Sequence, residues 1–356
     1  MKVLQVINAL TAGGAQKLIA DFVPIMNKKN VPTDVLLFTE DKGPFLHILL
    51  EKNVKVLNIK SKHLYSPYNA LMAAKYFDKY DIIHAHLFPA IYWTSLAKIV
   101  RPANKRAKYL LTEHNNSNRR FTKSYLQPVD KFIYDRFDAL IAISESVKDV
   151  LWKRVAHPNI PIVYNAVNVN DLSAAVPVSL PENQINLLMV AAFRDQKDQH
   201  TLIKAMQQLD DRYHLYLAGE GATLEECRQL ATDLNVEQRV HFMGVRKDVP
   251  GLMKAADINI LSSHWEGLSC VVLEAMASGK PFIGTDIYGI KEMFRDNPFA
   301  LFQTGDVDAL SQKIRKIAED KAFALLQSET NFETVKKFDI DLMTDQYLDI
   351  YTQLLK

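Results

Sequence analysis

Two carboxylates stand near the ends of the stretch HWEGLSCVVLEAM, which runs from His264 to Met276. Its pattern predicts a strand over 258–261, a loop over 262–267 and a helix over 271–278. Glu266 would lie in the loop and Glu274 in the first turns of the helix. Carboxylates accept hydrogen bonds from hydroxyl groups, so both residues are candidates to bind the hydroxyls of a sugar or a ribose. The alternative is a helix N-terminal acid stabilised by the helix dipole, beside an unrelated surface acid.

A glycine pair follows the first predicted strand in the sequence TAGGA, residues 11–15. Gly13 and Gly14 would let the backbone approach a phosphate, and the helix that begins near Gln16 would offer unpaired amides and a partial positive charge. A glycine pair also makes an ordinary tight turn. The fingerprint GxGxxG of dinucleotide-binding proteins is absent from the sequence, which disfavours a dehydrogenase.

A second candidate phosphate site is the sequence FRDQKD, residues 193–198, between a predicted strand and a predicted helix. Arg194 and Lys197 place cations in this loop, where they could bind a diphosphate. The alternative interpretation is a solvated charged turn.

Histidines occur at the ends of two further predicted strands. His84 and His86 share one face of an extended chain, which is compatible with a metal pair, but no third ligand follows at a recognisable spacing. We therefore predict no metal site. His114 lies just past a strand, where its side chain could enter a binding site and donate to a substrate hydroxyl. The alternative is a structural histidine.

Strand-like apolar runs alternate with helical stretches, which predicts an α/β fold with two doubly wound parallel sheets. Sheets of this kind bind ligands beyond the carboxyl ends of their strands, where all four candidate loops would lie. We expect domains at 1–168 and 169–338, followed by a closing segment, 339–356, with apolar residues at helical spacing. The predicted strands are 3–7, 33–38, 54–57, 81–84, 109–112 and 139–143 in the first half, and 187–190, 214–218, 240–242, 258–261 and 281–285 in the second.

Composition narrows the class of protein. The 356 residues are 48% hydrophobic and 24% charged, which is typical of a globular protein of about two domains. Cys227 and Cys270 are the only cysteines, so a disulfide framework and a cysteine-rich zinc site are excluded. No apolar run has the roughly 18 to 20 residues of a membrane helix. Because the amino-terminal residues resemble a strand rather than a signal peptide, we expect a cytoplasmic protein.

The net charge of +2 is unevenly distributed. Residues 1–170 contain 24 lysines and arginines against 13 acids, a balance of +11, whereas the remainder has 19 against 28, a balance of −9. A basic half favours anionic partners such as a lipid diphosphate, a membrane surface or nucleic acid. No recognised nucleic-acid motif accompanies the charge, so we predict no nucleic-acid partner. The alternative is that the charge difference between the two halves is ordinary variation of the protein surface, without a partner.

Glu266, seven residues and Glu274, followed by AMASGKP, resemble the E-x7-E signature of retaining glycosyltransferases of family 4, which have the GT-B fold of two Rossmann-like domains facing a central cleft. The resemblance covers nearly the whole chain, because further family motifs occur in the family's order. They are GGA (13–15), DIIHAH (81–86), TEH (112–114), AISES (142–146), IVYN (162–165), QKD (196–198), LAGEG (217–221) and FMG (242–244).

The resemblance implies a donor that is a nucleotide diphosphate sugar, more often a UDP-sugar than a GDP-sugar, with no metal and no further cofactor. The implied catalytic residues are Glu266, His114 and Lys197: Glu266 and His114 would bind the transferred hexose or N-acetylhexosamine, and Lys197 the diphosphate. It also implies that the final helix crosses back to the N-terminal domain. The implied donor-binding residues are Gly13, Gly14, Arg194, Lys197, Gly219, Glu274, Asn165, Ser269 and Leu268.

Three positions depart from the family pattern. Ala192 stands where the family usually has an arginine near the diphosphate, and Arg194 is its possible substitute. The usual Asn-Gly-Val-Asp is Asn-Ala-Val-Asn at 165–168, and the Gly-Gly before a late glutamate is changed at 288–292. These changes leave two alternatives open, a catalytically weak transferase-like binding subunit and a nucleotide-sugar epimerase of the same fold.

The acceptor is expected to dock on the basic N-terminal half. This surface would suit a polysaccharide or lipid-linked glycan of the cell envelope. The protein would bind such an acceptor at the inner face of the cytoplasmic membrane. The residues that suggest it are Lys105, Arg106, Lys108, Arg119, Arg120 and Lys123 with Tyr109, Phe121 and Tyr125, and the apolar stretch Leu64, Tyr65, Tyr68, Leu71 and Met72.

Overall fold

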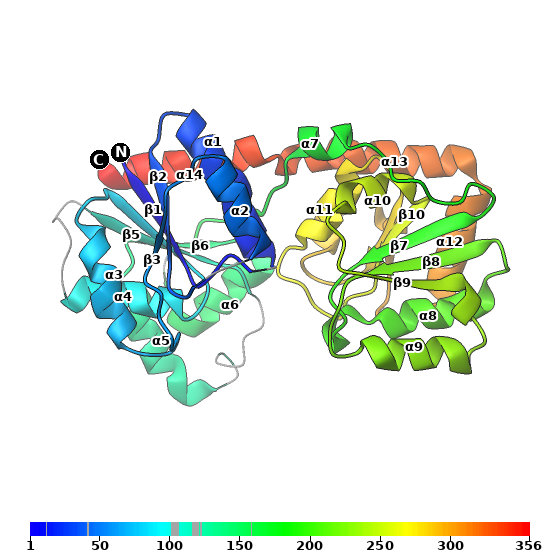
Figure 1. Ribbon diagram of the computed structural model, residues 1–356, viewed down its shortest axis with the longest axis horizontal. Coiled ribbons are helices and arrows are strands. Elements are labelled where there is room, and N and C mark those ends of the chain that lie inside the picture. Colours follow the sequence, from blue (N-terminus) through cyan, green and yellow to red (C-terminus); the bar gives the residue numbers. More distant parts are fainter. Residues whose placement is uncertain (12, 41–42, 101–106, 116–120, 122, 158) are drawn as a thin grey trace. The chain divides into compact units, whose positions relative to one another are not determined.

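The computed structural model contains two compact units, and it describes all residues except 12, 41–42, 101–106, 116–120, 122 and 158. Unit 1 comprises Met1–Ala166 together with Ile340–Lys356, and unit 2 comprises Val167–Asp339. The units are drawn in Figure 1, where most helices and strands are labelled. Since Lys105, Arg106, Arg119 and Arg120 lie outside the described residues, the expected basic surface is described only in part.

Unit 1 contains a six-stranded parallel sheet in the order β3-β2-β1-β4-β5-β6. Its strands are β1 (Val3–Ile7), β2 (Thr33–Leu37), β3 (Val56–Asn58), β4 (Ile82–His86), β5 (Lys108–Glu113) and β6 (Ala139–Ala142). Its helices are α1 (Gly14–Lys28), α2 (Pro44–Glu51), α3 (Tyr68–Phe77), α4 (Ala90–Val100), α5 (Gln127–Tyr134), α6 (Glu145–Val155) and α14 (Ile340–Leu355).

Unit 2 repeats the arrangement with the order β12-β11-β10-β7-β8-β9. Its strands are β7 (Ile185–Val190), β8 (Tyr213–Ala218), β9 (Val240–Gly244), β10 (Ile258–Leu261), β11 (Phe282–Thr285) and β12 (Leu301–Phe302). Its helices are α7 (Val169–Ala174), α8 (Gln199–Gln208), α9 (Leu224–Asp233), α10 (Val249–Ala255), α11 (Cys270–Ala277), α12 (Val307–Glu319) and α13 (Lys321–Val335). In both sheets the first strand lies beside the fourth, so the strand order reverses between β1 and β4 and between β7 and β10.

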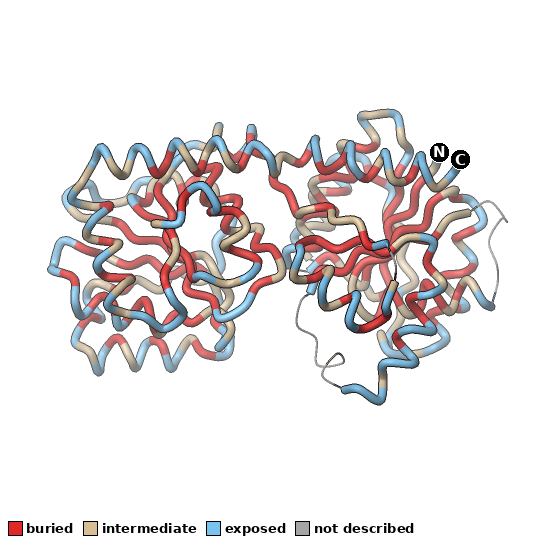
Figure 2. Tube along the Cα trace, turned by 180° about the vertical axis from the view of Figure 1, so that it is seen from behind, coloured by how far each residue is buried: buried red, intermediate tan, exposed pale blue. Residues whose placement is uncertain are grey.

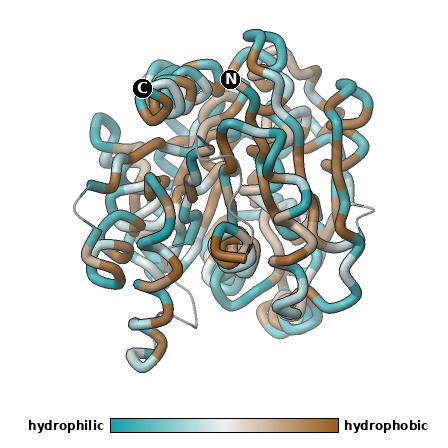
Figure 3. Tube along the Cα trace, turned by 90° about the vertical axis from the view of Figure 1, so that its left-hand side faces the viewer, coloured by the Kyte–Doolittle hydropathy of each residue, from teal (hydrophilic) through white to brown (hydrophobic). Residues whose placement is uncertain are grey.

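The interiors of the two units follow from this topology. The strands of a parallel sheet are covered by helices on both faces, and accordingly the strands in Figure 2 are almost continuously buried except for the edge strands β3, β9 and β12. The covering helices alternate hydrophobic and hydrophilic segments along their length, as Figure 3 shows. The predicted doubly wound α/β architecture is therefore confirmed. The sequence analysis did not predict β12, because two residues are too short for a periodic signal.

Helix α14 is part of the core of unit 1. Met343, Tyr347 and Tyr351 are buried against α1 and the sheet, and the ring of Tyr347 stacks on that of Phe22 with centroids 5.7 Å apart. Lys29, the residue after α1, adds an exposed ion pair with Asp345 at 2.5 Å. The periodicity predicted this closing helix correctly, and its apolar face completes the packing of the first unit.

Neighbouring residues of α14 test this packing. Met343 is 3% exposed in the core and Leu342 is 50% exposed on the same turn. We expect Met343→Ala to lower the free energy of unfolding by about 2–5 kcal/mol, since it leaves a cavity. The control Leu342→Ala should change it by less than about 0.5 kcal/mol. Denaturant unfolding measures both values, and equal values for the two variants would contradict the role of α14 in the core.

Candidate active site

The point of unit 2 where the strand order reverses carries two of the predicted site residues. The loop after β7 holds Lys197, and the loop after β10 holds Glu266. Because β7 and β10 are adjacent parallel strands, both loops leave the sheet at the same edge. This is the position where doubly wound sheets bind their ligands.

Lys197 and Glu266 form a partly buried ion pair. The Lys197 Nζ atom lies 2.5 Å from Glu266 Oε1, and the two side chains are 18% and 9% exposed. The Ser263 hydroxyl donates to the same carboxylate oxygen at 2.7 Å. The two residues that the sequence analysis assigned to the diphosphate and to the sugar are thus in direct contact with each other.

Hydrogen bonds fix the two loops against one another. The Ser262 hydroxyl donates to the carbonyl oxygen of Asp198 at 2.7 Å, and the Gln196 side-chain amide donates to the carbonyl oxygen of Trp265 at 2.7 Å. The Asp198 side chain accepts from the backbone N–H of Thr201 at 3.2 Å and so caps α8. Lys197 therefore stands on a turn held at both ends.

Gly289 supports the loop that carries Glu266. It has φ +85°, and a Cβ atom at this position would lie 2.7 Å from the carbonyl oxygen of Glu266. The backbone N–H of Ser269 also donates to the Gly289 carbonyl oxygen at 3.2 Å. Only glycine combines this φ with such a close approach. The altered sequence at 288–292 thus keeps one glycine in direct contact with the site loop.

The remaining predicted residues of unit 2 surround these loops. Leu268 and Ser269 are the two residues before α11 and both are buried, as is Glu274 within the helix. Gly219 follows β8 with φ +148°, and a Cβ there would lie 2.0 Å from the Ala191 carbonyl oxygen, so the loops after β7 and β8 touch through their backbones. Arg194 is exposed at the start of the Lys197 turn.

The reversal point of unit 1 is bridged by Asn8, a residue that the sequence analysis did not select. Its amide donates to the carbonyl oxygen of Phe88 at 2.8 Å and accepts from the backbone N–H of Ala90 at 3.0 Å, which ties the loop after β1 to the loop after β4. Gly13 and Gly14 are exposed at the start of α1, whose first turn carries no acidic side chain. The unpaired amides of this helix end favour an anion.

Histidines form a buried cluster at the carboxyl ends of β4 and β5. His86 Nδ1 lies 3.0 Å from His114 Nε2, and His84 and His86 stack with ring centroids 4.2 Å apart. Glu113, next to His114, accepts from the Tyr134 hydroxyl at 2.8 Å. His84 and His86 are confirmed to share one face of a strand.

Burial changes the titration of this cluster. It lowers the pKa of His84 to about 3, with a smaller contribution from His114, and lowers the pKa of His114 to about 4. The pKa of His86 is well below its ordinary value, again chiefly because of burial. Within the described ranges, no group of three or more histidine, cysteine, aspartate or glutamate side chains is placed to hold a metal ion.

Two asparagines flank the boundary between the units. Asn165 is buried at the end of the first part of unit 1. Asn168, which replaces the family's aspartate, accepts from the backbone N–H of Asp171 at 3.0 Å and caps α7. Asparagine and aspartate are comparable N-caps, so this departure preserves the local structure.

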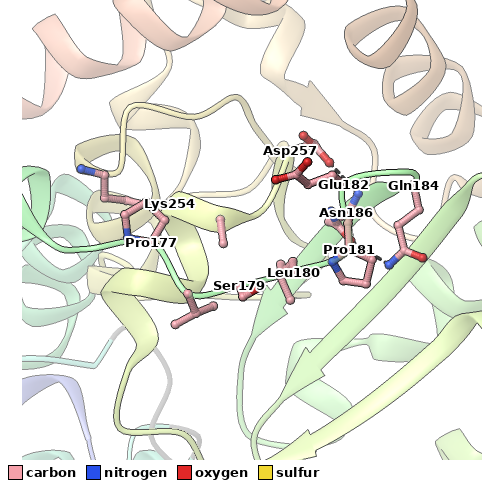
Figure 4. A pocket seen from close by; sticks show the side chains of 11 residues that line it. Pro177, Ser179, Leu180, Pro181, Glu182, Gln184, Asn186, Lys254 and Asp257 are labelled. Carbon is pink, nitrogen blue, oxygen red and sulfur yellow. Dashed lines mark hydrogen bonds between the residues drawn. The ribbon is translucent and has the colours of Figure 1, made fainter.

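A pocket of about 390 Å³ in unit 2 lies at the opposite edge of the sheet (Figure 4). It is lined by Asn186 at the start of β7 and Asp257 just before β10, and the Asp257 carboxylate accepts from the backbone N–H of Asn186 at 2.7 Å. These are the amino-terminal ends of the strands, and ligands of doubly wound sheets bind at the other ends. The pocket is therefore separate from the loops that carry Lys197 and Glu266.

The fold and the motifs define a two-domain GT-B protein of Rossmann-like units. The sequence profile described as Glycosyltransferase Family 4 matches residues 12–171, and the profile described as Glycosyl transferases group 1 matches residues 175–333. The chain belongs to this family of glycosyltransferases, as its motifs predicted.

Named relatives agree with this assignment. The chain is 32% identical to the lipopolysaccharide core biosynthesis glycosyltransferase LpsE of Rhizobium meliloti (strain 1021), over 58% of this chain and 61% of that protein. The chain thus spans about three fifths of the length of LpsE. It is 22% identical over 92% of its length, and 90% of the relative, to the Escherichia coli UDP-Gal:alpha-D-GlcNAc-diphosphoundecaprenol alpha-1,3-galactosyltransferase.

A solved structure shares the fold. Anabaena Alr3699/HepE in complex with UDP-glucose superposes with a TM-score of 0.85 at 22% identity, covering 99% of this chain and 100% of that one. Such low identity establishes the architecture alone.

Several residues of the site were not found by sequence reasoning. Ser263 lies three residues before Glu266 in the same loop and donates to its carboxylate, and Gly289 contacts the backbone of Glu266 from the loop after β11. Gln5 contacts His86 and is buried in β1 among apolar neighbours. A polar residue in the middle of the run VLQVI was a usable signal, because both faces of a central parallel strand are normally apolar.

The neutral histidine cluster predicts acid sensitivity. Because these pKa values are lower in the folded than in the unfolded protein, the unfolded chain binds more protons below about pH 6.5. Stability is therefore full above that pH and is lost as the pH falls toward 4, with a slope of at most about 1.4 kcal/mol per pH unit for each histidine. Thermal unfolding between pH 7.5 and 4.5 measures this loss. A variant with His84→Asn should show a shallower slope, and equal slopes would contradict the assignment.

Proposed function

We propose that this chain is a metal-independent retaining glycosyltransferase that moves a hexose or N-acetylhexosamine from a UDP-sugar to a lipid-linked or polysaccharide acceptor. The observation that carries the proposal is the Lys197–Glu266 pair at the ligand-binding edge of unit 2. A cation and an acid set 2.5 Å apart on fixed loops suit a donor that has a negative diphosphate joined to a polyhydroxyl sugar.

The donor would exchange one set of contacts for another. Lys197 would turn from Glu266 to the diphosphate oxygens, which carry more negative charge than one carboxylate. Glu266 would then accept hydrogen bonds from hydroxyl groups of the sugar, while the Ser263 hydroxyl would continue to donate to Glu266 Oε1. Because breaking the ion pair costs electrostatic energy, only a ligand that satisfies both residues can open it.

The chemistry follows from these roles. The acceptor hydroxyl would attack the anomeric carbon on the face from which the nucleotide diphosphate leaves, and a diphosphate oxygen would take its proton. The C–O bond to the diphosphate breaks as the new glycosidic bond forms, so the configuration is retained. Lys197 and the unpaired amides at a helix N-terminus would stabilise the charge on the leaving group. Glu266 would favour the positive charge that develops on the sugar.

The name of the Escherichia coli relative describes an acceptor sugar linked to diphosphoundecaprenol. We extend this class of acceptor to the present chain because unit 1 exposes large apolar side chains. Figure 3 views this unit end-on. The exposed apolar surface comprises Tyr65, Tyr68, Leu71, Tyr125, Val129, Phe132 and Trp152, on or beside α3, α5 and α6.

Contacts below this surface join its parts. Phe88 contacts both Tyr65 and Tyr92, with ring centroids 6.0 Å and 5.1 Å apart, and the Tyr92 hydroxyl donates to Asp130 of α5. Lys123 is exposed just before α5, and Lys131 of α5 is paired with Asp135 at 2.8 Å. Tyr109, which the sequence analysis placed among the basic residues, is buried in β5 and takes no part. The described helices include none long and apolar enough to cross a bilayer.

Donor binding gives the first test. We expect one class among UDP-, GDP- and ADP-sugars to raise the melting temperature of the protein, equally with magnesium and with chelator. Glu266→Gln and Lys197→Ala should each lower transfer by about 100- to 1000-fold, since each removes a contact that strengthens in the transition state. Glu225→Gln and Lys204→Ala, exposed in the same unit, are the matched controls.

Two results would contradict the donor assignment. One is full transfer activity in either site variant. The other is a thermal shift that disappears with chelator, which would mean that binding of the diphosphate requires a cation.

Membrane contact gives a separate test. We expect vesicles containing anionic lipid to sediment the protein at low salt and to release it as salt rises. Phe132→Ser should weaken sedimentation several-fold by removing an apolar side chain from the interface. Leu325→Ser removes an equally exposed apolar residue from unit 2 and should have no effect. If both variants sediment identically, the exposed apolar surface of unit 1 does not contact the membrane.

A further inference from the structure

A continuous chain of hydrogen bonds connects His114 with the carboxyl-terminal helix of unit 1. Each member contacts the next through one polar atom pair, and the members come from β1, β4, β5, the residue after β5 and α14. In order, the pairs are His114 Nε2 with His86 Nδ1 (3.0 Å), His86 Nε2 with Gln5 Oε1 (2.8 Å), Gln5 Nε2 with Tyr351 Oη (3.1 Å), Tyr351 Oη with His84 Nδ1 (2.6 Å), His84 Nε2 with Thr112 Oγ1 (2.8 Å) and Thr112 Oγ1 with Tyr347 Oη (3.2 Å).

The amide of Gln5 gives this chain its direction. Its oxygen can only accept, so His86 must carry a proton on Nε2. A neutral His86 then has a lone pair on Nδ1, and the proton between the two rings belongs to Nε2 of His114. Because a neutral imidazole has one protonated nitrogen, Nδ1 of His114 has none.

Tyr351 is the second partner of that amide and couples it to His84. The Gln5 Nε2–H group donates to the Tyr351 oxygen, whose own proton is then directed to His84 Nδ1. His84 in turn donates from Nε2 to the Thr112 hydroxyl. If the Gln5 amide were reversed, every bond in the chain would have to reverse with it, and His114 Nδ1 would become a donor. The polarity at His114 therefore follows the orientation of the Gln5 amide, and the Tyr351 hydroxyl transmits the same polarity to His84.

His114 Nδ1 has a free hydrogen-bonding position. It is buried, and it has no hydrogen-bond partner among the residues that the structure describes. An unpaired acceptor that is removed from water is costly unless a ligand satisfies it. His114 lies just beyond the carboxyl end of β5, on the edge of the sheet where ligands bind.

We propose that Tyr351, Gln5 and His86 hold His114 in the Nε2–H tautomer, so that its Nδ1 accepts a hydrogen bond from a hydroxyl group of the substrate sugar. Tyr351, Gln5 and His86 are positioning residues, because they act through His114. The assignment reverses the expectation that His114 donates to the substrate. The ligand rests on the proposed function, whereas the tautomer rests on the hydrogen bonds alone.

The low pKa of all three histidines, which burial produces, agrees with a neutral chain. The titratable groups facing it are Tyr347 and Tyr351, whose pKa values burial raises, so these hydroxyls keep their protons. At neutral pH every member of the chain is then uncharged.

Nitrogen-15 spectra of the histidine rings test the tautomer without any activity measurement. The full-length protein is labelled at histidine, and the signals are assigned with His86→Asn and His114→Asn. We expect both rings as Nε2–H tautomers at pH 7.5, with His114 Nδ1 giving the shift of an unprotonated ring nitrogen. A protonated Nδ1 at His114 would overturn the proposal.

Two tyrosine variants test the role of α14. Tyr351→Phe removes the acceptor of the Gln5 amide, so the amide can reverse and the protonated Nδ1 form of His114 should become visible. Tyr347→Phe removes a hydroxyl one turn away but leaves every bond between His114 and His84 intact, so His114 should remain unchanged. Equal spectra for both variants would refute the control by Tyr351.

The same variants connect the tautomer with the substrate. UDP-glucose and UDP-N-acetylglucosamine are the probes, and the one that binds should move the His114 Nδ1 signal, whereas UDP alone should not. Tyr351→Phe should lower kcat/KM for that donor by about fivefold relative to Tyr347→Phe, which corresponds to the loss of about one hydrogen bond. An unchanged Nδ1 signal with a bound sugar donor would overturn the ligand part of the proposal. A correct tautomer in a protein that binds neither probe would contradict the proposed function instead.

Discussion

Parallel pairing in both sheets determines where chemistry can occur in this protein. When all strands run in one direction, all connections to the following helices leave from the same edge, and the reversal of strand order leaves a gap between two diverging loops. The pairs β1 with β4 and β7 with β10 create one such gap in each unit. Asn8 bridges the first gap, and Lys197 and Glu266 meet across the second. Lys197 and Glu266 are therefore far apart in the chain but share one edge of their sheet.

Each unit also has polar groups buried beside these gaps, and they are tolerated because they are paired. In unit 2 the Glu266 carboxylate is compensated by an ammonium group and a hydroxyl, and in unit 1 three imidazoles are hydrogen-bonded to one another, to an amide, to a threonine hydroxyl and to a phenol. A buried polar group without a partner is expensive, so such networks fix side chains in one arrangement. Fixed side chains are what a glycosyltransferase needs when it binds a charged and flexible donor.

The sequence was informative where local rules apply. Strand-to-helix transitions placed Lys197 and Glu266 in loops, and alternation placed His84 and His86 on one face. Contacts that depend on chain closure could not be foreseen in this way. Tyr351 lies 267 positions after His84, and its apolar periodicity indicated a packed helix but not a hydroxyl aimed at a histidine. Gly289 likewise supports Glu266 from a third loop, and only the folded backbone reveals the close approach.

The inclusion of α14 in unit 1 has a consequence for synthesis on the ribosome. Unit 2 is one continuous segment, Val167–Asp339, so all of its strands have emerged before the chain reaches α14. Unit 1 begins first but lacks Tyr347 and Tyr351 in its core until α14, which follows the whole of unit 2 in the chain, has been made. The nascent first unit must therefore keep an apolar groove between α1 and its sheet uncovered while the whole second unit is made. The domain that is translated first is the one that finishes folding last.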